Sequence, residues 1–417
     1  MINIEKRYIE AQTIYEEIGV NSQQAIEELA KIPISIHCWQ GDDVAGFENR
    51  PLSGGIAATG NYIGRPRNYQ ELMDDIDFAL RLIPGKHRLN LHANYAITGG
   101  EPVERNELKP EHFAKWVEFA KGRGMGLDFN PTFFSHPKAE VATLSSYDED
   151  IRKFWIGHGI ACVKIAEYFA KELDTYCHLN IWIPDGMKDT PSDRFSPRMI
   201  LKDSLDCILA TDYDRNKVLV SVESKVFGIG LESFTVGSHE FYMNYATQKG
   251  ILCLIDNGHY HPTENVADKI SSMLAFSEKV ALHVTRPIRW DSDHVVALDD
   301  SSREIAKEII VHGADKVLLG LDFFDASINR IVAWVIGVRN MQKALLAALL
   351  TPHDYMRTLQ RQQRFTELLM LQEEIKTYPL GDVWDYFCVI NNVPAKATWF
   401  GEVQRYEDEV LSQRASN

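Results

Sequence analysis

The chain has 417 residues, of which 45% are hydrophobic and 25% charged, as is usual for a globular protein. This composition excludes a disordered chain, a collagen-like chain and a small disulfide-rich scaffold. The 44 basic and 59 acidic residues give a net charge of −15, so the chain lacks the basic surface that nucleic acids and anionic membranes attract.

Short β-rich segments alternate with amphipathic segments along most of the chain. The predicted strands are residues 33–39, 87–94, 126–134, 176–183, 217–224, 251–259, 280–286 and 316–324. The predicted helices are residues 70–83, 110–122, 148–173, 197–209, 238–249, 264–277, 301–312 and 328–350. The strands are nearly continuous apolar runs, which is typical of parallel strands covered on both faces. Eight strand–helix units predict an α/β fold, namely a (β/α)8 TIM barrel, with a doubly wound open sheet as the alternative.

Three segments define the expected domain organisation. Residues 1–350 are predicted to form the barrel catalytic domain with an N-terminal helix, and residues 351–417 a helical C-terminal extension that packs on the barrel or on a neighbouring subunit. Residues 41–68 show no periodicity and are either a lid or binding loop, or a surface excursion. The glycines at 122, 124 and 126 follow a helix and precede a strand, which indicates a helix end and turn rather than a dinucleotide motif.

Several features favour a soluble cytoplasmic protein. The six cysteines form no C-x-x-C pair and lie mostly in apolar runs, so they are predicted to be buried, reduced thiols. The N-terminus lacks the apolar core of a signal peptide. The most membrane-like stretch, residues 331–350, contains Arg339 and Lys343, which favours a buried helix over a membrane span.

Residues suited to bind metal follow the last four predicted strands, at the end of a barrel where active sites lie. Buried carboxylates repel one another unless cations lie between them. We therefore predict two cation sites, the first from Glu223, Asp256, His283 and Asp322, and the second from His259, Asp291 and Asp293. Oxygen-rich sets with one imidazole favour Mg²⁺, Mn²⁺ or Co²⁺ over structural zinc, although the first set also admits Zn²⁺. Any one of these residues alone could equally be an ordinary core or surface residue.

Other strand ends carry candidate substrate-binding and catalytic residues. Lys225, two residues after Glu223, is interpreted as a cation that stabilises an oxyanion, with a Schiff-base nucleophile or an ion-pair partner as alternatives. His92, Trp182 and, with less support, Trp39 suit the apolar face and hydroxyls of a sugar, although core packing explains Trp182 equally well.

These residues lie in segments that closely resemble the L-rhamnose isomerase family, within the wider xylose-isomerase-like barrels. The similar segments are Ile36-His-Cys-Trp-Gln-Gly-Asp-Asp43, Val222-Glu-Ser-Lys225, Asp256-Asn-Gly-His259, His283-Val-Thr-Arg-Pro-Ile-Arg-Trp-Asp-Ser-Asp293 and Gly320-Leu-Asp-Phe-Phe-Asp-Ala-Ser327. The resemblance covers essentially the whole chain, including the helical tail.

The resemblance implies an aldose–ketose isomerase that converts L-rhamnose to L-rhamnulose with Mn²⁺, in a homotetramer to which the tail contributes contacts. It implies that the first ligand set is structural and the second catalytic. Polarising both O1 and O2 of the sugar suits a 1,2-hydride shift, with proton transfer near Asp291 and Lys225 stabilising charge on O1.

Three other classes of protein remain as alternatives. A two-metal hydrolase on the same barrel, such as an endonuclease acting at abasic sites, is disfavoured by the net charge of −15. A lysine-dependent aldolase has no need of seven metal-type ligands. A non-catalytic sugar-binding protein has little use for a pair of open metal sites.

Overall fold

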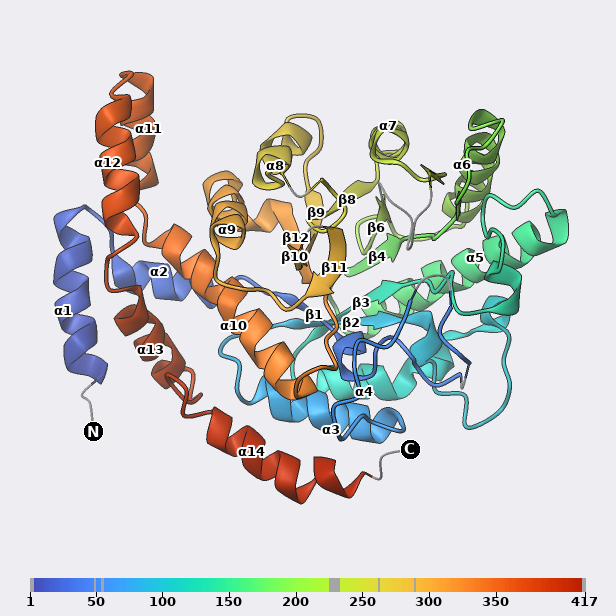
Figure 1. Cartoon of the computed structure of the whole chain (residues 1–417), viewed down its shortest axis with the longest axis horizontal. Helices are drawn as coiled ribbons and strands as arrows, with labels where there is room; N and C mark the ends of the chain where they lie inside the picture. The colour runs from blue at the N-terminus through green and yellow to red at the C-terminus, as the bar shows by residue number, and fades with distance from the viewer. Residues whose placement is uncertain are drawn as a thin grey trace.

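A computed structural model describes residues 4–48, 50–53, 56–224, 233–261, 263–288 and 290–414. Eight parallel strands close into a barrel, and the two ends of the sheet meet where Ser35 of the first strand pairs with Gly320 of the last (Figure 1). The barrel strands are β1 (Ser35–His37), β2 (Arg88–His92), β3 (Gly126–Asn130), β4 (Cys177–Ile181), β6 (Val218–Glu223), β8 (Leu252–Asp256), β9 (Val280–Val284) and β12 (Val317–Leu321). This closure confirms the predicted TIM barrel and excludes an open doubly wound sheet.

A helix follows every barrel strand and covers the outside of the barrel, as the sequence predicts. The bounds are α3 (Tyr69–Leu80), α4 (Ala114–Lys121), α5 (Glu149–Glu172), α6 (Phe195–Leu209), α7 (His239–Lys249), α8 (Ala267–Leu274), α9 (Asp300–His312) and α10 (Arg330–Leu349). Local chemistry sets several boundaries. Asp148 accepts hydrogen bonds from the first backbone N–H groups of α5, and Gly250 ends α7 with a φ of +64°. Gly124, with a φ of +61°, lies in the turn between α4 and β3, as expected.

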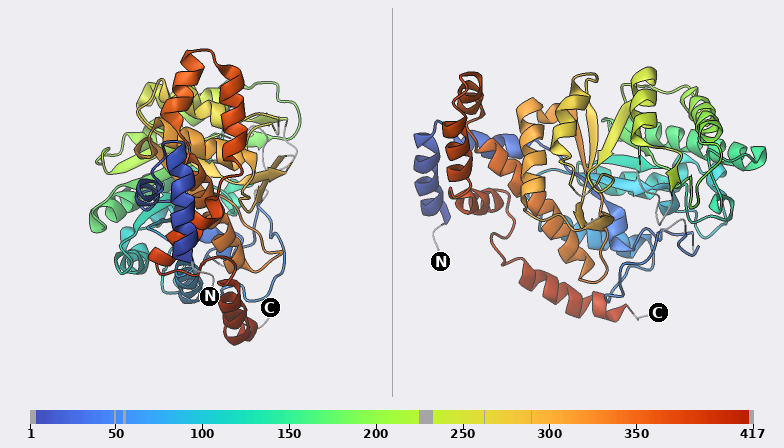
Figure 2. Two further views of the ribbon diagram at one scale, coloured as in Figure 1. Left: turned by 90° about the vertical axis from the view of Figure 1, so that its left-hand side faces the viewer. Right: turned by 45° about the horizontal axis from the view of Figure 1, so that its top comes forward.

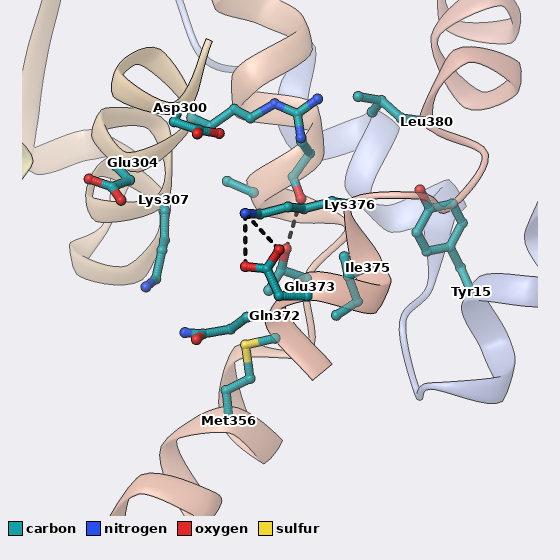
Figure 3. Close-up of a pocket in the computed structure, with 14 residues that line it drawn as sticks. Tyr15, Asp300, Glu304, Lys307, Met356, Gln372, Glu373, Ile375, Lys376 and Leu380 are labelled. Atoms are coloured by element: carbon teal, nitrogen blue, oxygen red, sulfur yellow. Dashed lines mark hydrogen bonds and ion pairs between the residues drawn. The ribbon is translucent and has the colours of Figure 1, made fainter. Parts of the chain in front are cut away.

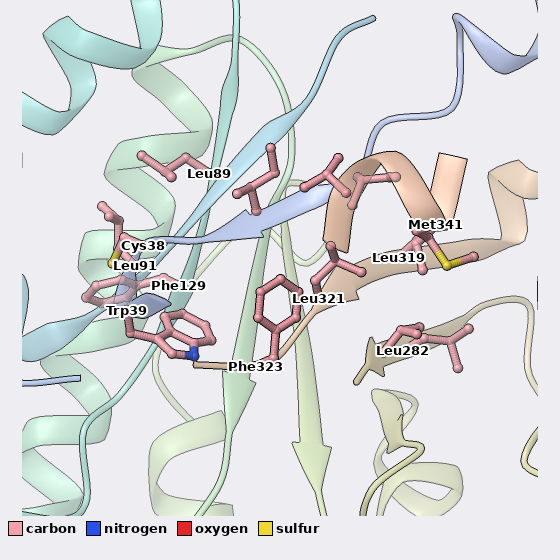
Figure 4. Close-up of a cluster of buried hydrophobic side chains, with 14 of the residues drawn as sticks. Cys38, Trp39, Leu89, Leu91, Phe129, Leu282, Leu319, Leu321, Phe323 and Met341 are labelled. Carbon is pink, nitrogen blue, oxygen red and sulfur yellow. The ribbon is translucent and has the colours of Figure 1, made fainter. Parts of the chain in front are cut away.

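Apolar side chains fill the space around and between these layers. Figure 4 shows part of this core, with Leu89 and Leu91 of β2, Phe129 of β3 and Leu321 of β12, on strands that lie on either side of β1. Helix α10 is long and apolar enough to cross a membrane, but 72% of its apolar window is buried inside the fold, as expected of a core helix. All six cysteines are free thiols, and five are buried as predicted; Cys207 is exposed, so the prediction is wrong at that position.

Additional helices lie at both ends of the chain. Two helices, α1 (Ile4–Glu17) and α2 (Ser22–Leu29), precede the barrel, where the sequence predicted one. The tail forms α11 (His353–Arg361), α12 (Phe365–Ile375), α13 (Leu380–Ile390) and α14 (Phe400–Glu409). Helices α11 and α12 form a hairpin that projects at one edge of the molecule (Figure 2), and α14 runs along the outside of α3 (Figure 1). Short 3-10 turns occupy Cys38–Gly41, Ala93–Tyr95, Arg105–Glu107, Pro110–Phe113, Pro137–Ala139, Ala314–Lys316 and Leu411–Gln413.

Polar contacts hold the tail to the barrel. Asp75 of α3 accepts hydrogen bonds from Arg414, at 2.6 and 2.8 Å, and from the Tyr406 hydroxyl, at 2.8 Å. At the other edge, Tyr8 of α1 stacks on Tyr386 of α13 with 3.9 Å between the ring centroids. Much of the extension therefore packs against the same chain.

Two small two-stranded antiparallel sheets were not predicted. One pairs β10 (Arg286–Ile288) with β11 (Trp290–His294), and the other pairs β5 (Gly186–Met187) with β7 (Phe234–Thr235). Asp291 and Asp293, which follow the predicted strand 280–286, therefore lie in a strand, β11, that the sequence did not predict. The segment was missed because it is short and polar, without the apolar alternation that marks a strand.

Candidate active site

Four side chains converge where the last four barrel strands end. Glu223 and Asp256 are the final residues of β6 and β8, His283 lies in β9, and Asp322 directly follows β12. Each offers one ligand atom, and these atoms all lie within 4.8 Å of one another. The first predicted ligand set is thus brought together in space by strands that are neighbours in the barrel.

A close backbone approach makes room for the histidine of this cluster. Gly320 of β12 pairs with His283 of β9. A Cβ atom at Gly320 would lie 3.1 Å from the imidazole, so a larger residue would displace the ring. The glycine in the apolar run of β12 therefore serves the site.

Several buried polar atoms of the cluster have no hydrogen-bond partner among the described residues. These atoms are Oδ2 of Asp256 and both ring nitrogens of His283. The carboxylate oxygens nearest to His283 Nδ1 are those of Asp322, at 3.4 Å, and Glu223, at 3.5 Å. Buried polar atoms without partners cost free energy, and oxygen and imidazole ligands suit a divalent cation. The residues present therefore fit a bound metal ion.

The electrostatics of the cluster agree with this interpretation. Burial, reinforced by Glu223 and Asp322, raises the pKa of Asp256 to about 7 despite the opposing effect of His259. Burial alone would lower the pKa of His283, but Glu223 and Asp322 raise it well above its usual value. Burial would raise the pKa values of Glu223 and Asp322, but His283, helped by His259 at Glu223 and by His37 and Trp39 at Asp322, lowers both. Without a metal ion, protons on Asp256 and His283 therefore offset the negative charge of the crowded carboxylates.

The second predicted set adjoins the first. His259 Nε2 lies 3.6 Å from Oδ2 of Asp291 and 3.8 Å from Oδ2 of Asp256. Asp256 belongs to the first set and therefore also borders the second. Asp293 lines the same pocket. These three residues are not part of the group of four converging ligand atoms. Lys225 lies outside the described residues.

Two hydrogen bonds orient carboxylates of the first set from the side. The Asn180 amide donates to Glu223 Oε2 at 2.6 Å and accepts from the Ser221 hydroxyl at 2.8 Å. The Trp39 indole donates to Asp322 Oδ1 at 2.9 Å. Such outer contacts fix the direction in which ligand oxygens point.

A row of aromatic rings borders the acidic cluster. The edge-to-face contacts run from Trp39 to His92 at 4.8 Å, from His92 to Phe134 at 5.5 Å, and from Phe134 to Trp182 at 5.8 Å between centroids. Burial lowers the pKa of His92 to about 3, so this ring is neutral. The three predicted substrate-binding residues therefore share one wall of the pocket, which adjoins the carboxylates at Trp39, and an apolar wall of this kind suits a sugar face.

The pocket lined by the aromatic rings and the acidic cluster also contains residues that the sequence analysis did not select. Asn130, Phe134, Asn180 and Phe324 follow or end strands, and this position is the signal that could have identified them. Val44 and Ile56 come from the aperiodic segment 41–68. That segment therefore contributes to the pocket, as a binding loop would, and is not only a surface excursion.

A larger groove lies away from these residues (Figure 3). It is bordered by α9, by the C-terminal part of α10, by the tail helix α12 and by Tyr15 of α1. Its charged residues include Lys307, Glu304 and the ion pair of Lys376 with Glu373 at 2.9 Å. No predicted site residue lines it.

Comparison with known proteins decides the family. Residues 2–414 match the model of the L-rhamnose isomerase (RhaA) family. The chain is 55% identical over 417 residues to L-rhamnose isomerase of Mannheimia succiniciproducens, covering 99% of this chain and all of that protein. It is 51% identical over 415 residues to the enzyme of Listeria monocytogenes serotype 4a, covering 99% of both chains.

The chain belongs to the L-rhamnose isomerase family. Among solved structures, an L-ribulose 3-epimerase covers 76% of this chain and 95% of its own, with 11% identity and a TM-score of 0.48. The apo 3-keto-D-glucoside 4-epimerase YcjR of E. coli covers 69% and 97%, with 11% identity and a TM-score of 0.45. The assignment to this family of isomerases rests on the sequence similarity and not on these distant structures.

Proposed function

We propose that this member of the L-rhamnose isomerase family interconverts L-rhamnose and L-rhamnulose. The full-length similarity to proteins named L-rhamnose isomerase, at 51% and 55% identity, carries the proposal. The pocket supports it chemically, because aromatic rings and acidic metal-type ligands line the same pocket.

The proposed cofactor is Mn²⁺ at two sites per subunit, with Co²⁺ or Mg²⁺ as substitutes and Zn²⁺ possible at the structural site. Glu223, Asp256, His283 and Asp322 would hold the structural ion. His259, Asp291 and Asp293 would hold the catalytic ion. When bound, a divalent cation polarises the carbonyl of the open-chain sugar and acidifies the neighbouring hydroxyl.

The protein's own groups bind and orient the sugar in this proposal. Trp39, His92 and Trp182 bind its apolar face, and neutral His92 presents a ring that can hydrogen-bond a hydroxyl. Asp291 holds the proton that passes between O1 and O2, and Lys225 stabilises negative charge on O1. The hydrogen moves from C2 to C1 with its electron pair, while the C2–O2 bond becomes a carbonyl and the C1 carbonyl becomes an alcohol.

The deciding experiment is to incubate the protein with Mn²⁺ and L-rhamnose and to follow ketose formation. L-Rhamnulose should appear until equilibrium is reached, and treatment with a chelator should abolish its formation. L-Mannose, which carries a hydroxyl on C6 where L-rhamnose has hydrogen, serves as a comparison substrate. Absence of ketose from every aldose in metal-loaded, folded protein would contradict the proposal.

The proposed assembly is a homotetramer in which residues 351–417 add subunit contacts to the catalytic domain of residues 1–350. Apolar side chains on the projecting helix α12 support it, since Phe365, Leu369 and Met370 are 59%, 60% and 52% exposed. Analytical ultracentrifugation should give the mass of four chains, and Leu369→Lys should lower it. The buried free thiols agree with a cytoplasmic location.

A further inference from the structure

A closed set of three hydrogen bonds lies behind the second ligand set. Nδ1 of His259 contacts the backbone carbonyl of Ser224 at 2.7 Å. The backbone carbonyl of His259 contacts Nε2 of His239 at 3.2 Å. The set is completed by a short contact between Nδ1 of His239 and the hydroxyl of Ser224. It connects the end of β6, the segment after β8, and the first turn of α7.

The chemistry of the partners fixes the direction of every bond. A backbone carbonyl only accepts, so Nε2 of His239 must carry hydrogen. In the neutral ring Nδ1 is then an acceptor, and the Ser224 hydroxyl donates to it. By the same rule Nδ1 of His259 carries hydrogen and donates to the Ser224 carbonyl. The lone pair of a neutral His259 ring is therefore on Nε2, the nitrogen that faces Asp256 and Asp291 at 3.8 and 3.6 Å.

His239 itself is held firmly. It is 8% exposed and stacks on Tyr260, with 4.0 Å between centroids and 16° between the ring planes. Ser224 is 1% exposed. Water therefore has little access to replace either partner, and loss of the ring would leave the Ser224 hydroxyl and the His259 carbonyl without their partners.

We propose that His239 is a positioning residue for the second metal site, because it fixes the backbone at His259 and thereby directs Nε2 of that residue at the ion. The inference rests on the proposed function, which places an ion at His259, Asp291 and Asp293. In this proposal His239 itself contacts neither the substrate nor the metal ion. Outer-shell partners of metal-binding histidines commonly change metal affinity by about 10- to 100-fold.

The test is Mn²⁺ binding to metal-free protein, measured by calorimetry and by the electron paramagnetic resonance signal of free Mn²⁺. His239→Phe keeps the stacking on Tyr260 but removes both hydrogen bonds. It should weaken the second ion by about 10- to 100-fold and leave the first unchanged. His239→Gln retains an N–H donor and should recover part of the affinity. Tyr242→Phe is the control, because the Tyr242 hydroxyl is buried without a hydrogen-bond partner among the described residues, and it should bind both ions as wild type does.

The outcomes separate this inference from the proposed function. If the wild type binds two ions, and folded His239→Phe binds both with unchanged affinity, the inference is wrong while the proposed function stands. If the wild type binds only one ion, the proposed second site is wrong, and the inference is wrong with it. If His239→Phe does not fold, Ser224→Ala removes one bond of the set and should weaken only the second ion, and unchanged binding by that variant likewise overturns the inference.

Discussion

The Trp39 indole donates a 2.9 Å hydrogen bond to Oδ1 of Asp322, which joins the end of β1 to the end of β12. The bond occupies one carboxylate oxygen and leaves Oδ2 facing His283 at 3.4 Å. The same indole packs on His92 in the aromatic wall. One residue therefore orients a predicted metal ligand and borders the predicted substrate pocket.

Trp39→Phe tests this double role, because it keeps an aromatic ring but removes the N–H donor. We expect the protein to fold and the first metal ion to bind about 10- to 100-fold more weakly, since a hydrogen bond to a charged group contributes about 1.5–3 kcal/mol. Calorimetric titration with Mn²⁺ measures the change. Trp116→Phe also removes a buried indole donor, to the Tyr95 carbonyl, and neither of these residues lines the pocket. An equal loss of metal affinity in both variants would contradict a specific effect on Asp322.

Asp322→Asn and Asp291→Asn separate the two proposed sites. Asp322→Asn should lose the ion of the first set and with it both activity and the stability that a bound ligand adds. Asp291→Asn should remain folded, keep the first ion and lose turnover by orders of magnitude. The difference does not come from solvent access, because the side chains are 22% and 13% exposed respectively; it comes from which ion each residue holds.

Metal counts by elemental analysis and thermal melts in Mn²⁺ compare the two variants directly. Equal melting temperatures in both variants and wild type, or normal turnover by Asp291→Asn, would show that the division into structural and catalytic sites is wrong.

In chelated protein, Asp256→Asn should leave stability unchanged at low pH and raise it at high pH. Burial and the neighbouring carboxylates raise the folded-state pKa of Asp256 to about 7, above the ordinary aspartate value of 3.8. The folded protein therefore favours the neutral carboxyl, and the stability this gives is lost as pH rises from about 4 to about 7. Asparagine is neutral throughout, so the variant should match wild type near pH 4 and be more stable, by a few kcal/mol at most, at pH 8.

Urea unfolding at pH 4.5 and pH 8 in the presence of chelator measures this difference. Saturating Mn²⁺ should invert the ranking at pH 8, because only the carboxylate binds the ion tightly. A variant less stable than chelated wild type at pH 8 would contradict the raised pKa of Asp256.

Isomerisation in heavy water distinguishes a hydride shift from an enediol route. Direct transfer keeps the original hydrogen, so early L-rhamnulose should carry almost no deuterium at C1. Proton NMR of the ketose at low conversion gives the result, and substantial deuterium at C1 would indicate exchange through an enediol. Product incubated with the enzyme in heavy water controls for later exchange.

Arg105 should be important for stability, because it holds the loop that carries Phe134. Its buried guanidinium donates to the carbonyls of Thr132, at 2.6 Å, and Phe134, at 2.5 Å, and pairs with Glu48 at 2.7 Å. Arg105→Met leaves these acceptors unpaired and should cost about 3–5 kcal/mol of unfolding free energy. Denaturant unfolding gives this value.

Arg123→Met is the matched control, because Arg123 forms a partly exposed ion pair with Asp77. Exposed pairs contribute about 0–1 kcal/mol, so this variant should unfold close to wild type. Similar losses in the two variants would show that the contacts of Arg105 to the loop carry no special weight.

The sequence alone determined the barrel strands and the helices between them. Uninterrupted apolar runs such as 316–324 can be buried on both faces only in a covered parallel sheet, and eight repeats of strand and helix close most readily into a barrel. The same pattern placed Glu223, Asp256 and Asp322 at strand ends, because the apolar run stops where the polar ligand begins. Such local signals depend on neighbours in the chain and are visible without coordinates.

Only the tertiary structure decided which strand-end side chains meet. Asn180 and Phe134 resembled any other polar or aromatic residue until barrel closure brought Asn180 to Glu223 and Phe134 between His92 and Trp182. The contact of His239 with Ser224 escaped prediction for the same reason. Hydrogen bonds between residues far apart in sequence leave no periodic trace, because they depend on how the whole chain packs rather than on local residue order.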